Sequence, residues 1–208
     1  MEYFPFYMDI ENVRCLVVGG GKTALHKINV LLPFKPVITV TAPEICGEIL
    51  KIPGIETRER GFEERDLDDV KFVISATNDS SLNRRIYELC LERNIPINSV
   101  DDKQSCTFIF PAIVKKKSVT AAVSTGGKSP AGARFLKLLI DDALDDNALN
   151  AVEILGEYRE KIQSSLSSAD KRRQAFEALL DLCLISGNDI CGEDVDDIIR
   201  AVKSKVEN

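Results

Sequence analysis

The 208-residue sequence predicts an α/β fold, in which a mostly parallel sheet with helices on its faces is followed by a helical C-terminal segment. Three observations lead to this prediction. Short apolar runs alternate with helical patterns through the first part of the chain, as they do in consecutive βαβ units. The first of these runs ends in three consecutive glycines, Gly19, Gly20 and Gly21. Beyond Gly127 the periodic segments have the spacing of amphipathic helices.

The first three predicted elements form one βαβ unit. Residues 14–18 are apolar and β-branched in part, which is typical of a buried strand. Residues 23–32 place Ala24 and Ile28 on one face of a helix, and two prolines follow that helix. Residues 37–40 have the pattern of a second strand. Strand, glycine turn, helix and strand thus follow one another within about 27 residues.

The alternation continues as far as residue 124. We predict further strands at residues 55–58, 72–76, 97–100, 107–109 and 118–124. The intervening helices are predicted at residues 45–50 and 82–93. The C-terminal helices are predicted at residues 130–144, 148–162, 174–184 and 193–203, with Gly187 just beyond the third. Their acidic outer faces suit a helical appendage or an element that packs in a dimer.

Charge divides the chain near the start of the helical segment. The whole chain has 27 basic and 33 acidic residues, and its net charge is -6. Residues 141–208 hold 8 Lys and Arg against 16 Asp and Glu, so they carry -8 while the rest carries +2. We therefore expect a domain boundary near residues 141–148. Because no strong basic stripe is present, nucleic-acid binding has little support.

Cysteine usage and hydropathy favour a cytoplasmic protein. The six cysteines form no CxxC pair, so we expect free thiols in a reducing compartment. His26 is the only histidine, which excludes a histidine-rich metal site. No apolar run reaches the roughly 18 residues that a membrane span needs. Residues 1–9 also lack the basic and apolar regions of a secretory signal.

The glycine turn predicts a dinucleotide site. Residues 19–24 fit the pattern G-x-G-x-x-G/A, between a strand and a helix as that pattern requires. Gly19 permits the tight turn, Gly21 lets a pyrophosphate approach the backbone, and Ala24 allows close packing of helix on strand. The helix N-terminus then offers free N–H groups and a partial positive charge to the phosphates. The alternative is a glycine turn with no ligand.

The segment after the second strand favours NAD over NADP. The acidic residue that binds the adenosine ribose should stand at the end of the second strand, and Glu44 is acidic but lies four residues beyond Val40. No arginine occurs between Thr41 and Leu50 to hold a 2′-phosphate. We therefore expect NAD as the cofactor.

Six short motifs occur along the chain in a defined order. They are residues 3–5 (YFP), 17–21 (VVGGG), 76–79 (ATND), 98–101 (NSVD), 108–111 (FIFP) and 124–130 (STGGKSP). In this order they resemble the precorrin-2 dehydrogenase / sirohydrochlorin ferrochelatase family, which includes the N-terminal module of siroheme synthase. The resemblance covers about residues 3–140.

The resemblance implies a fold, a reaction and an assembly. The domains would be a Rossmann domain at 1–112, a dimerisation region at 113–147 and a helical domain at 148–208. The reaction would be the NAD-dependent oxidation of precorrin-2 to sirohydrochlorin in siroheme, and so porphyrin, biosynthesis. Some members are also ferrochelatases, a lyase activity in which ferrous iron is a further substrate. Family members are homodimers that exchange the central segment.

The resemblance also implies which residues bind the cofactor and the tetrapyrrole. Six positions match family segments that contact NAD: Lys22 and Thr23 in the glycine loop, Pro43 and Glu44 after the second strand, and Thr77 and Asn78 after the strand at 72–76. Four positions match the loop near the proposed tetrapyrrole site: Ser124, Thr125, Gly126 and Lys128. A loop of hydroxyls and glycines that opens onto a helix can bind a carboxylate through backbone N–H groups.

Asp101 is the candidate catalytic residue. It matches the family aspartate in the N-x-V-D stretch, which is proposed to act in both activities. It follows a short strand, so we expect it to point into the crevice where the nicotinamide would lie. A carboxylate there could take the proton that dehydrogenation releases. The alternative is that Asp101 caps a turn and that Asp102 is merely solvated.

Several features leave other functions open. The family usually has arginine where His26 stands, and no preformed iron site is visible in the sequence. Lys115, Lys116 and Lys117 fit either a solvated hairpin turn or a patch that attracts the anionic substrate. A dinucleotide-binding sensor without catalysis is one alternative function. A tetrapyrrole carrier or chelatase with a vestigial NAD site is another.

Overall fold

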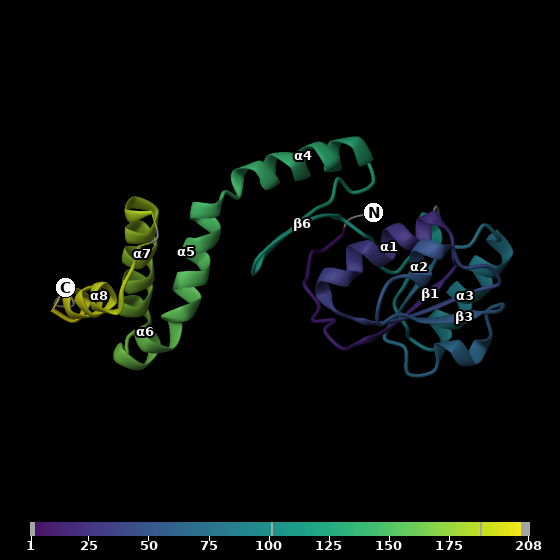
Figure 1. The fold of residues 1–208 in the computed structure, drawn as a ribbon, viewed down its shortest axis with the longest axis horizontal. Coiled ribbons are helices and arrows are strands. Elements are labelled where there is room, and N and C mark those ends of the chain that lie inside the picture. The colour runs from purple at the N-terminus through teal and green to yellow at the C-terminus, as the bar shows by residue number, and fades with distance from the viewer. Residues whose placement is uncertain (1–2, 101, 188, 205–208) are drawn as a thin grey trace. The chain divides into compact units, whose positions relative to one another are not determined.

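The computed structural model of the chain describes residues 3–100, 102–187 and 189–204. The chain forms two compact units, residues 1–110 and 111–208, which Figure 1 shows as a ribbon. Each unit has buried hydrophobic clusters of its own. No helix of the described residues is long and apolar enough to cross a membrane.

The first unit contains the predicted parallel sheet. Its five strands are β1 (Arg14–Val18), β2 (Val37–Ala42), β3 (Glu56–Glu59), β4 (Phe72–Ser75) and β5 (Ile97–Ser99). They lie in the order β3-β2-β1-β4-β5, and all four pairings are parallel. The strand order reverses between β1 and β4, which is the switch point where open α/β sheets bind their ligands. The predicted Rossmann-like fold class is therefore confirmed.

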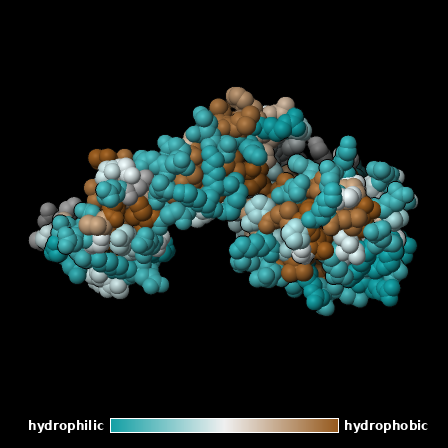
Figure 2. Space-filling model, in the orientation of Figure 1, coloured by the Kyte–Doolittle hydropathy of each residue, from teal (hydrophilic) through white to brown (hydrophobic). Residues whose placement is uncertain are grey.

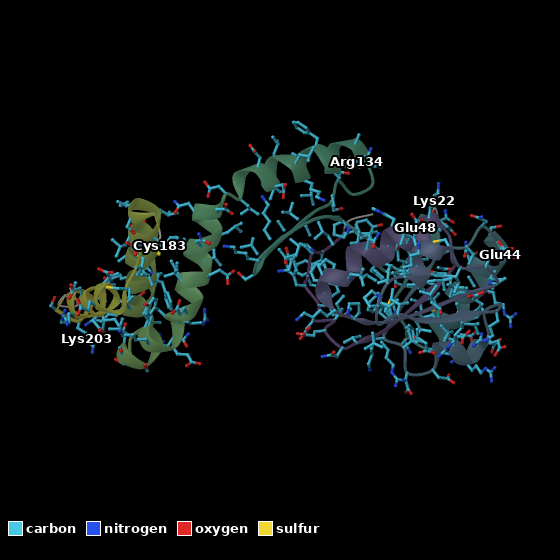
Figure 3. The ribbon with its side chains drawn as sticks, in the orientation of Figure 1. Lys22, Glu44, Glu48, Arg134, Cys183 and Lys203 are labelled. Carbon is cyan, nitrogen blue, oxygen red and sulfur yellow. The ribbon has the colours of Figure 1, made fainter. Side chains whose placement is uncertain are left out.

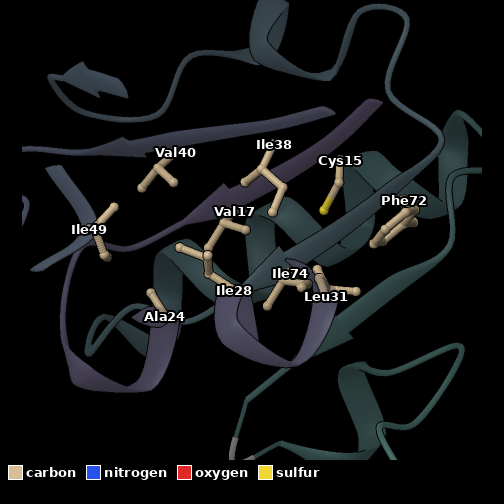
Figure 4. Close-up of a cluster of buried hydrophobic side chains, with 10 residues drawn as sticks. All are labelled: Cys15, Val17, Ala24, Ile28, Leu31, Ile38, Val40, Ile49, Phe72 and Ile74. Atoms are coloured by element: carbon tan, nitrogen blue, oxygen red, sulfur yellow. The ribbon is translucent and has the colours of Figure 1, made fainter. Parts of the chain in front are cut away.

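Helices cover both faces of this sheet. They are α1 (Lys22–Leu31), α2 (Gly47–Leu50) and α3 (Ser80–Glu92), with short 3-10 turns η1 (Leu32–Phe34), η2 (Glu64–Leu67) and η3 (Lys103–Ser105). In β1, Cys15 and Val17 pack in the cluster that includes α1, as Figure 4 shows. Leu16 and Val18 pack in the cluster that includes α3. Strands buried on both faces explain the nearly continuous apolar runs in the sequence.

The predicted strand at 107–109 is wrong, because this segment makes only the start of a strand. Cys106 forms an isolated antiparallel bridge with Asn98, and the Thr107 N–H donates to the Ile97 carbonyl at 2.8 Å. Beyond that point two aromatic rings turn onto the α1 face of the sheet. Phe108 packs edge-on to Phe72, with ring centroids 6.2 Å apart, and Phe110 packs on Phe108. Aromatic burial therefore replaces strand pairing here.

The second unit is a β-hairpin followed by helices. The hairpin pairs β6 (Ala112–Lys116) with β7 (Val119–Val123), and the sequence did not indicate β6. The helices are α4 (Pro130–Ala143), α5 (Asp146–Glu157), α6 (Arg159–Ser165), α7 (Ala169–Ser186) and α8 (Gly192–Ser204). The single helix predicted at 148–162 is two helices, because the backbone leaves helical geometry at Tyr158. Gly187 ends α7 in the left-handed conformation, as glycine beyond a helix end commonly does.

The hairpin turn is tied to the helices that follow it. The Lys116 ammonium donates to the carbonyl of Asp141 at 2.6 Å and to that of Leu144 at 3.1 Å, at the end of α4. The Ser118 hydroxyl donates to Glu153 of α5 at 2.6 Å. A cation at a helix C-terminus satisfies carbonyls that have no partner within the helix. Lys116 is therefore a structural residue, and the solvated-turn interpretation is wrong for it.

A buried carboxylate anchors the connection between β3 and β4. The Asp66 side chain is fully buried and accepts hydrogen bonds from Arg58 at 2.7 Å and from Arg60 at 2.6 Å. It also accepts from the Glu63 N–H at 2.9 Å, as part of a capping box at the start of η2. Burial tends to raise the pKa of Asp66, but these hydrogen bonds outweigh it and lower the pKa to about 2. The carboxylate therefore stays ionised in mild acid.

Replacing Asp66 should weaken the fold and remove part of its acid sensitivity. The folded-state pKa lies below the ordinary value of 3.8, so the ionised carboxylate stabilises the fold above about pH 4. That contribution, on the order of 2 kcal/mol, is lost as pH falls toward 2. Urea unfolding between pH 7 and pH 3 should show this loss in the wild type and a flatter profile in Asp66→Asn. Asp69→Asn, at an exposed ion pair with Arg14, should change stability by less than about 0.5 kcal/mol.

Candidate functional site

The candidate site lies at the edge of the sheet where the parallel strands end. Three backbone hydrogen bonds connect the segments that follow β1, β2 and β4 to one another. Gly19 donates to the Thr41 carbonyl at 2.9 Å, and Cys46 donates to the Gly20 carbonyl at 2.8 Å. Ala76 donates to the Val18 carbonyl at 2.8 Å. The glycine loop is thus held between the other two segments by its own backbone.

Gly19 makes the turn from strand to helix and touches the segment after β4. Its φ of +123° is a backbone conformation that residues with a side chain rarely adopt. A Cβ added there would lie 2.4 Å from the Ala76 carbonyl oxygen. Glycine is therefore required at this position by conformation and by space together.

Gly20 is required for a different reason, which the sequence pattern did not reveal. A Cβ at this position would lie 2.1 Å from the Glu44 carbonyl oxygen and 2.7 Å from the Ile45 Cα. These are backbone atoms, so no side chain can move aside to make room. The pattern G-x-G-x-x-G/A leaves this position free, whereas this chain packs the segment after β2 directly against it.

Gly21 faces open space at the start of α1. A Cβ built there would meet no atom of the described residues within 4 Å. Among those residues no side chain caps the first turn of α1, whereas Asp79 caps α3. The first N–H groups of α1 are thus available to an anion, and no acidic residue stands in that turn to oppose one. This arrangement fits the pyrophosphate of a dinucleotide.

The remaining loop positions divide between surface and core. Lys22 and Thr23 are exposed in the first turn of α1. Ala24 is fully buried in the cluster between α1 and the sheet, where a larger side chain would push the helix away. Figure 3 shows Lys22, Glu44 and Glu48 at the end of the first unit where α1 begins.

The segment after β2 brings Glu44 closer to the edge than the sequence indicated. The strand extends to Ala42, so Pro43 and Glu44 follow it directly. Both residues are exposed, and the backbone of Glu44 contacts Gly20. Thr41 is buried at the end of the same strand, and its hydroxyl has no hydrogen-bond partner among the residues that the structure describes.

The segment after β4 is held by an asparagine that sequence reasoning missed. The Thr77 hydroxyl donates to Asn83 Oδ1 at 2.7 Å, and Asn83 Nδ2 donates to the Thr77 carbonyl at 3.0 Å. The hydroxyl of Thr77 is therefore engaged within the chain, while Asn78 is exposed. One signal was present in the sequence, because Asn83 shares the inward face of α3 with Ile86 and Cys90.

Asp101 lies outside the described residues, but the turn after it is well defined. Asp102 caps η3, accepting hydrogen bonds from the Ser105 hydroxyl at 2.5 Å and the Gln104 N–H at 3.0 Å. These hydrogen bonds lower the pKa of Asp102 below its ordinary value. Asp102 is therefore a structural cap, and the expectation that it is merely solvated is wrong. The thiol of Cys106 donates to the Ser99 and Asp102 carbonyls, and burial raises its pKa.

The four predicted tetrapyrrole residues lie in the second unit, between β7 and α4. The Thr125 hydroxyl donates to the Ser129 carbonyl at 3.0 Å and accepts from the Ser129 N–H at 3.2 Å. The Gly126 N–H donates to the Ser124 hydroxyl at 3.2 Å, and the backbone N–H of Lys128 donates to the Thr125 carbonyl at 3.1 Å. Several N–H groups expected to hold a carboxylate are thus used inside the loop. The side chains of Ser124 and Lys128 are exposed.

Metal-ligating side chains do not gather in the parts of the chain that the structure describes. No group of three or more His, Cys, Asp or Glu residues there could hold a metal ion. His26 lies exposed on α1, within the first unit.

Comparisons with known proteins agree with a dinucleotide site in the first unit. Residues 6–112 match a family model described as putative NAD(P)-binding. The siroheme synthase of Thioalkalivibrio sulfidiphilus is 38% identical over 184 residues, which are 87% of this chain and 38% of that protein. The siroheme synthase of Pseudoalteromonas atlantica is 31% identical over 210 residues, covering 100% of this chain and 43% of that protein. The chain thus spans about two fifths of these relatives' length.

A solved structure described as "SirC, precorrin-2 dehydrogenase" has the same fold. It superposes with a TM-score of 0.74 at 21% sequence identity, and the match covers 98% of this chain and 100% of that one. At this level of identity the likeness supports the fold of both units.

Alanine at two adjacent glycines should separate folding from cofactor binding. Gly20→Ala places a methyl group against backbone, so we expect it to lower the free energy of unfolding by about 3 kcal/mol or to prevent folding. Gly21→Ala meets open space and should fold like the wild type, with stability changed by less than about 1 kcal/mol. Its methyl group would occupy the approach of the pyrophosphate, so the Kd for NAD should rise about tenfold. Thermal unfolding and calorimetric titration with NAD measure the two effects, and wild-type affinity in Gly21→Ala would contradict this assignment.

Proposed function

Because this chain belongs to the putative NAD(P)-binding family, we propose that it is an NAD-dependent dehydrogenase that oxidises precorrin-2 to sirohydrochlorin, a step of siroheme biosynthesis. The open approach to Gly21 and the uncapped start of α1 carry this proposal, because they form a phosphate site at the switch point of the sheet. The siroheme synthases among its relatives support the choice of substrate.

Glu44 supports NAD as the form of the cofactor. It follows β2 directly and its backbone contacts the glycine loop. An acidic side chain at this point accepts hydrogen bonds from ribose hydroxyls and repels a 2′-phosphate. We therefore infer that Glu44 selects NAD over NADP.

In the proposed reaction the cofactor accepts a hydride and the chain accepts a proton. When bound, NAD supplies the acceptor for the hydride that leaves the macrocycle. The chain must then accept the proton that leaves with it, which is a task for a carboxylate within reach of the substrate. Asp102 is already committed to capping η3. We therefore assign the proton acceptor to Asp101.

We further propose that the loop before α4 contacts the substrate through exposed groups. Thr125 is used to close the loop, so its contribution is structural. Ser124 and Lys128 remain exposed, and a tetrapyrrole that carries several carboxylates can pair with a lysine and a hydroxyl. Gly126 contributes the left-handed backbone that turns the loop, with φ of 62°.

The surface of α4 supports assembly as a homodimer. Every residue of this helix is at least partly exposed, and Phe135, Leu138 and Leu139 are 60%, 63% and 52% exposed. Figure 2 shows the hydrophobic colour gathered over α4. A two-stranded hairpin such as β6-β7 is marginal alone and needs further packing. We propose that a second copy of the chain covers residues 113–147.

A charge on this face should break the dimer. In sedimentation velocity we expect the wild type to sediment as a dimer and Leu138→Glu as a folded monomer, because the buried interface would have to hold an unpaired carboxylate. Ile185→Glu, at an 84% exposed position of α7 outside residues 113–147, serves as the charge control. A monomeric wild type would contradict the dimer.

The proposed activity is tested with precorrin-2 generated under anaerobic conditions. With NAD present and iron absent, the wild type should form sirohydrochlorin and NADH in equal amounts, and NADP should support a lower rate. Asp101→Asn should lower kcat by at least about a hundredfold, because its amide cannot accept the proton. Asp102→Asn, which alters only the cap, should retain most of the rate.

Two other outcomes would point to different functions. Binding of NAD without turnover would contradict the enzyme and indicate a sensor module. Tetrapyrrole binding without NAD binding would indicate a carrier. Adding ferrous iron after dehydrogenation tests the second activity, since a siroheme spectrum would show that iron is also a substrate.

A further inference from the structure

We propose that Asn83 is a positioning residue that holds Thr77, and through it the preceding Ala76–Thr77 peptide, against the glycine loop and so sets the affinity for the dinucleotide. The inference rests on the proposed function, because it concerns the same cofactor site. Asn83 lies on α3, on the opposite face of the sheet from α1. It would therefore act on the cofactor only through the segment that it holds.

The asparagine side chain makes three hydrogen bonds to Ser75 and Thr77, at the end of β4 and just beyond it. Its Oδ1 accepts from the Ser75 hydroxyl and from the Thr77 hydroxyl, each at 2.7 Å. Its Nδ2 donates to the Thr77 carbonyl at 3.0 Å. The side chain is buried, so each of these groups would be costly to leave without a partner. Asn83 thus fixes both the hydroxyl and the carbonyl of Thr77.

The residue that Asn83 holds, Thr77, is joined to Ala76 by the peptide that meets Gly19. The Ala76 carbonyl oxygen and the Thr77 nitrogen lie 2.4 Å and 3.3 Å from the position that a Cβ on Gly19 would take. The peptide and the glycine loop are therefore in contact at the switch point, next to the start of α1. A shift of this peptide changes the wall of the cofactor site even if the rest of the sheet stays in place.

This arrangement also assigns a role to Thr77. Its hydroxyl donates to Asn83, lies 3.1 Å from the Asp79 carbonyl, and accepts from the Asp79 N–H at 3.2 Å. With these partners the hydroxyl serves the turn that leads into α3, and any contact of Thr77 with the cofactor would use its backbone. An asparagine supplies both the acceptor and the donor that this turn requires, whereas a carboxylate would repel the Thr77 carbonyl.

The test measures NAD affinity and stability side by side in the full chain. Asn83→Ala should raise the Kd for NAD about tenfold by calorimetry, and Asn83→Asp should raise it as well. Ile86→Val is the matched control, because it removes one methylene from the same buried face of α3 without touching Thr77. It should lower the urea midpoint while leaving the Kd for NAD at the wild-type value.

A double-mutant cycle identifies the contact responsible. Thr77→Val removes the hydroxyl that donates to Asn83 Oδ1, and Thr77→Ser keeps that hydroxyl. If Asn83 acts through Thr77, the Kd of the double variant Thr77→Val with Asn83→Ala should rise much less than the product of the two single effects. This cycle also serves if Asn83→Ala folds poorly, because Asn83→Ser can replace it.

These measurements distinguish failure of the positioning role of Asn83 from failure of the proposed function. Wild-type affinity for NAD in Asn83→Ala would overturn the positioning role while leaving the proposed function intact. An equal rise in Kd for Ile86→Val would also overturn it, since α3 stability alone would then explain the effect. If the wild-type chain itself does not bind NAD, the proposed function fails, and this inference fails with it.

Discussion

The contact between the glycine loop and its two neighbouring segments is the constraint on which the cofactor site depends. Gly19 lies against the backbone after β4, and Gly20 lies against the backbone after β2. Because both contacts are backbone to backbone, they leave almost no freedom in where α1 begins. The first turn of α1, which no side chain of the described residues caps, consequently lies at the point where the strand order reverses. An anion site follows from packing that needs no ligand to form.

The two units differ in how much of their apolar surface they bury within themselves. The first unit buries both faces of its sheet under α1 and α3. In the second unit the last helices share a buried cluster, whereas α4 keeps large apolar side chains exposed. Lys116 and Ser118 connect the hairpin turn to α4 and α5 by polar contacts instead. This contrast is the physical reason for proposing a second copy of the chain over α4.

The sequence predicted the structure best at positions where a single requirement, such as burial, restricts the type of residue. Strands β1, β2 and β4 were predictable because burial on both faces makes their residues mostly apolar. Strand β6 was missed because Lys115 and Lys116 at its end obscure the alternation, and the break at Tyr158 has no proline, while the nearby Gly156 lies inside α5. Thr77 and Thr125 were predicted to face ligands, yet their hydroxyls close local turns, which motif spacing does not specify. Asn83 lies outside the six short motifs of the sequence, and its contacts depend on the fold that brings β4 to α3.

We propose that this chain holds a nicotinamide dinucleotide with its pyrophosphate at the start of α1. A crystal structure of the full chain grown with NAD would show the bound cofactor itself. We expect pyrophosphate oxygens within hydrogen-bond distance of the first N–H groups of α1, above Gly21, and the adenosine ribose beside Glu44. A dinucleotide bound elsewhere on the chain, with the approach to Gly21 filled by solvent, would contradict it.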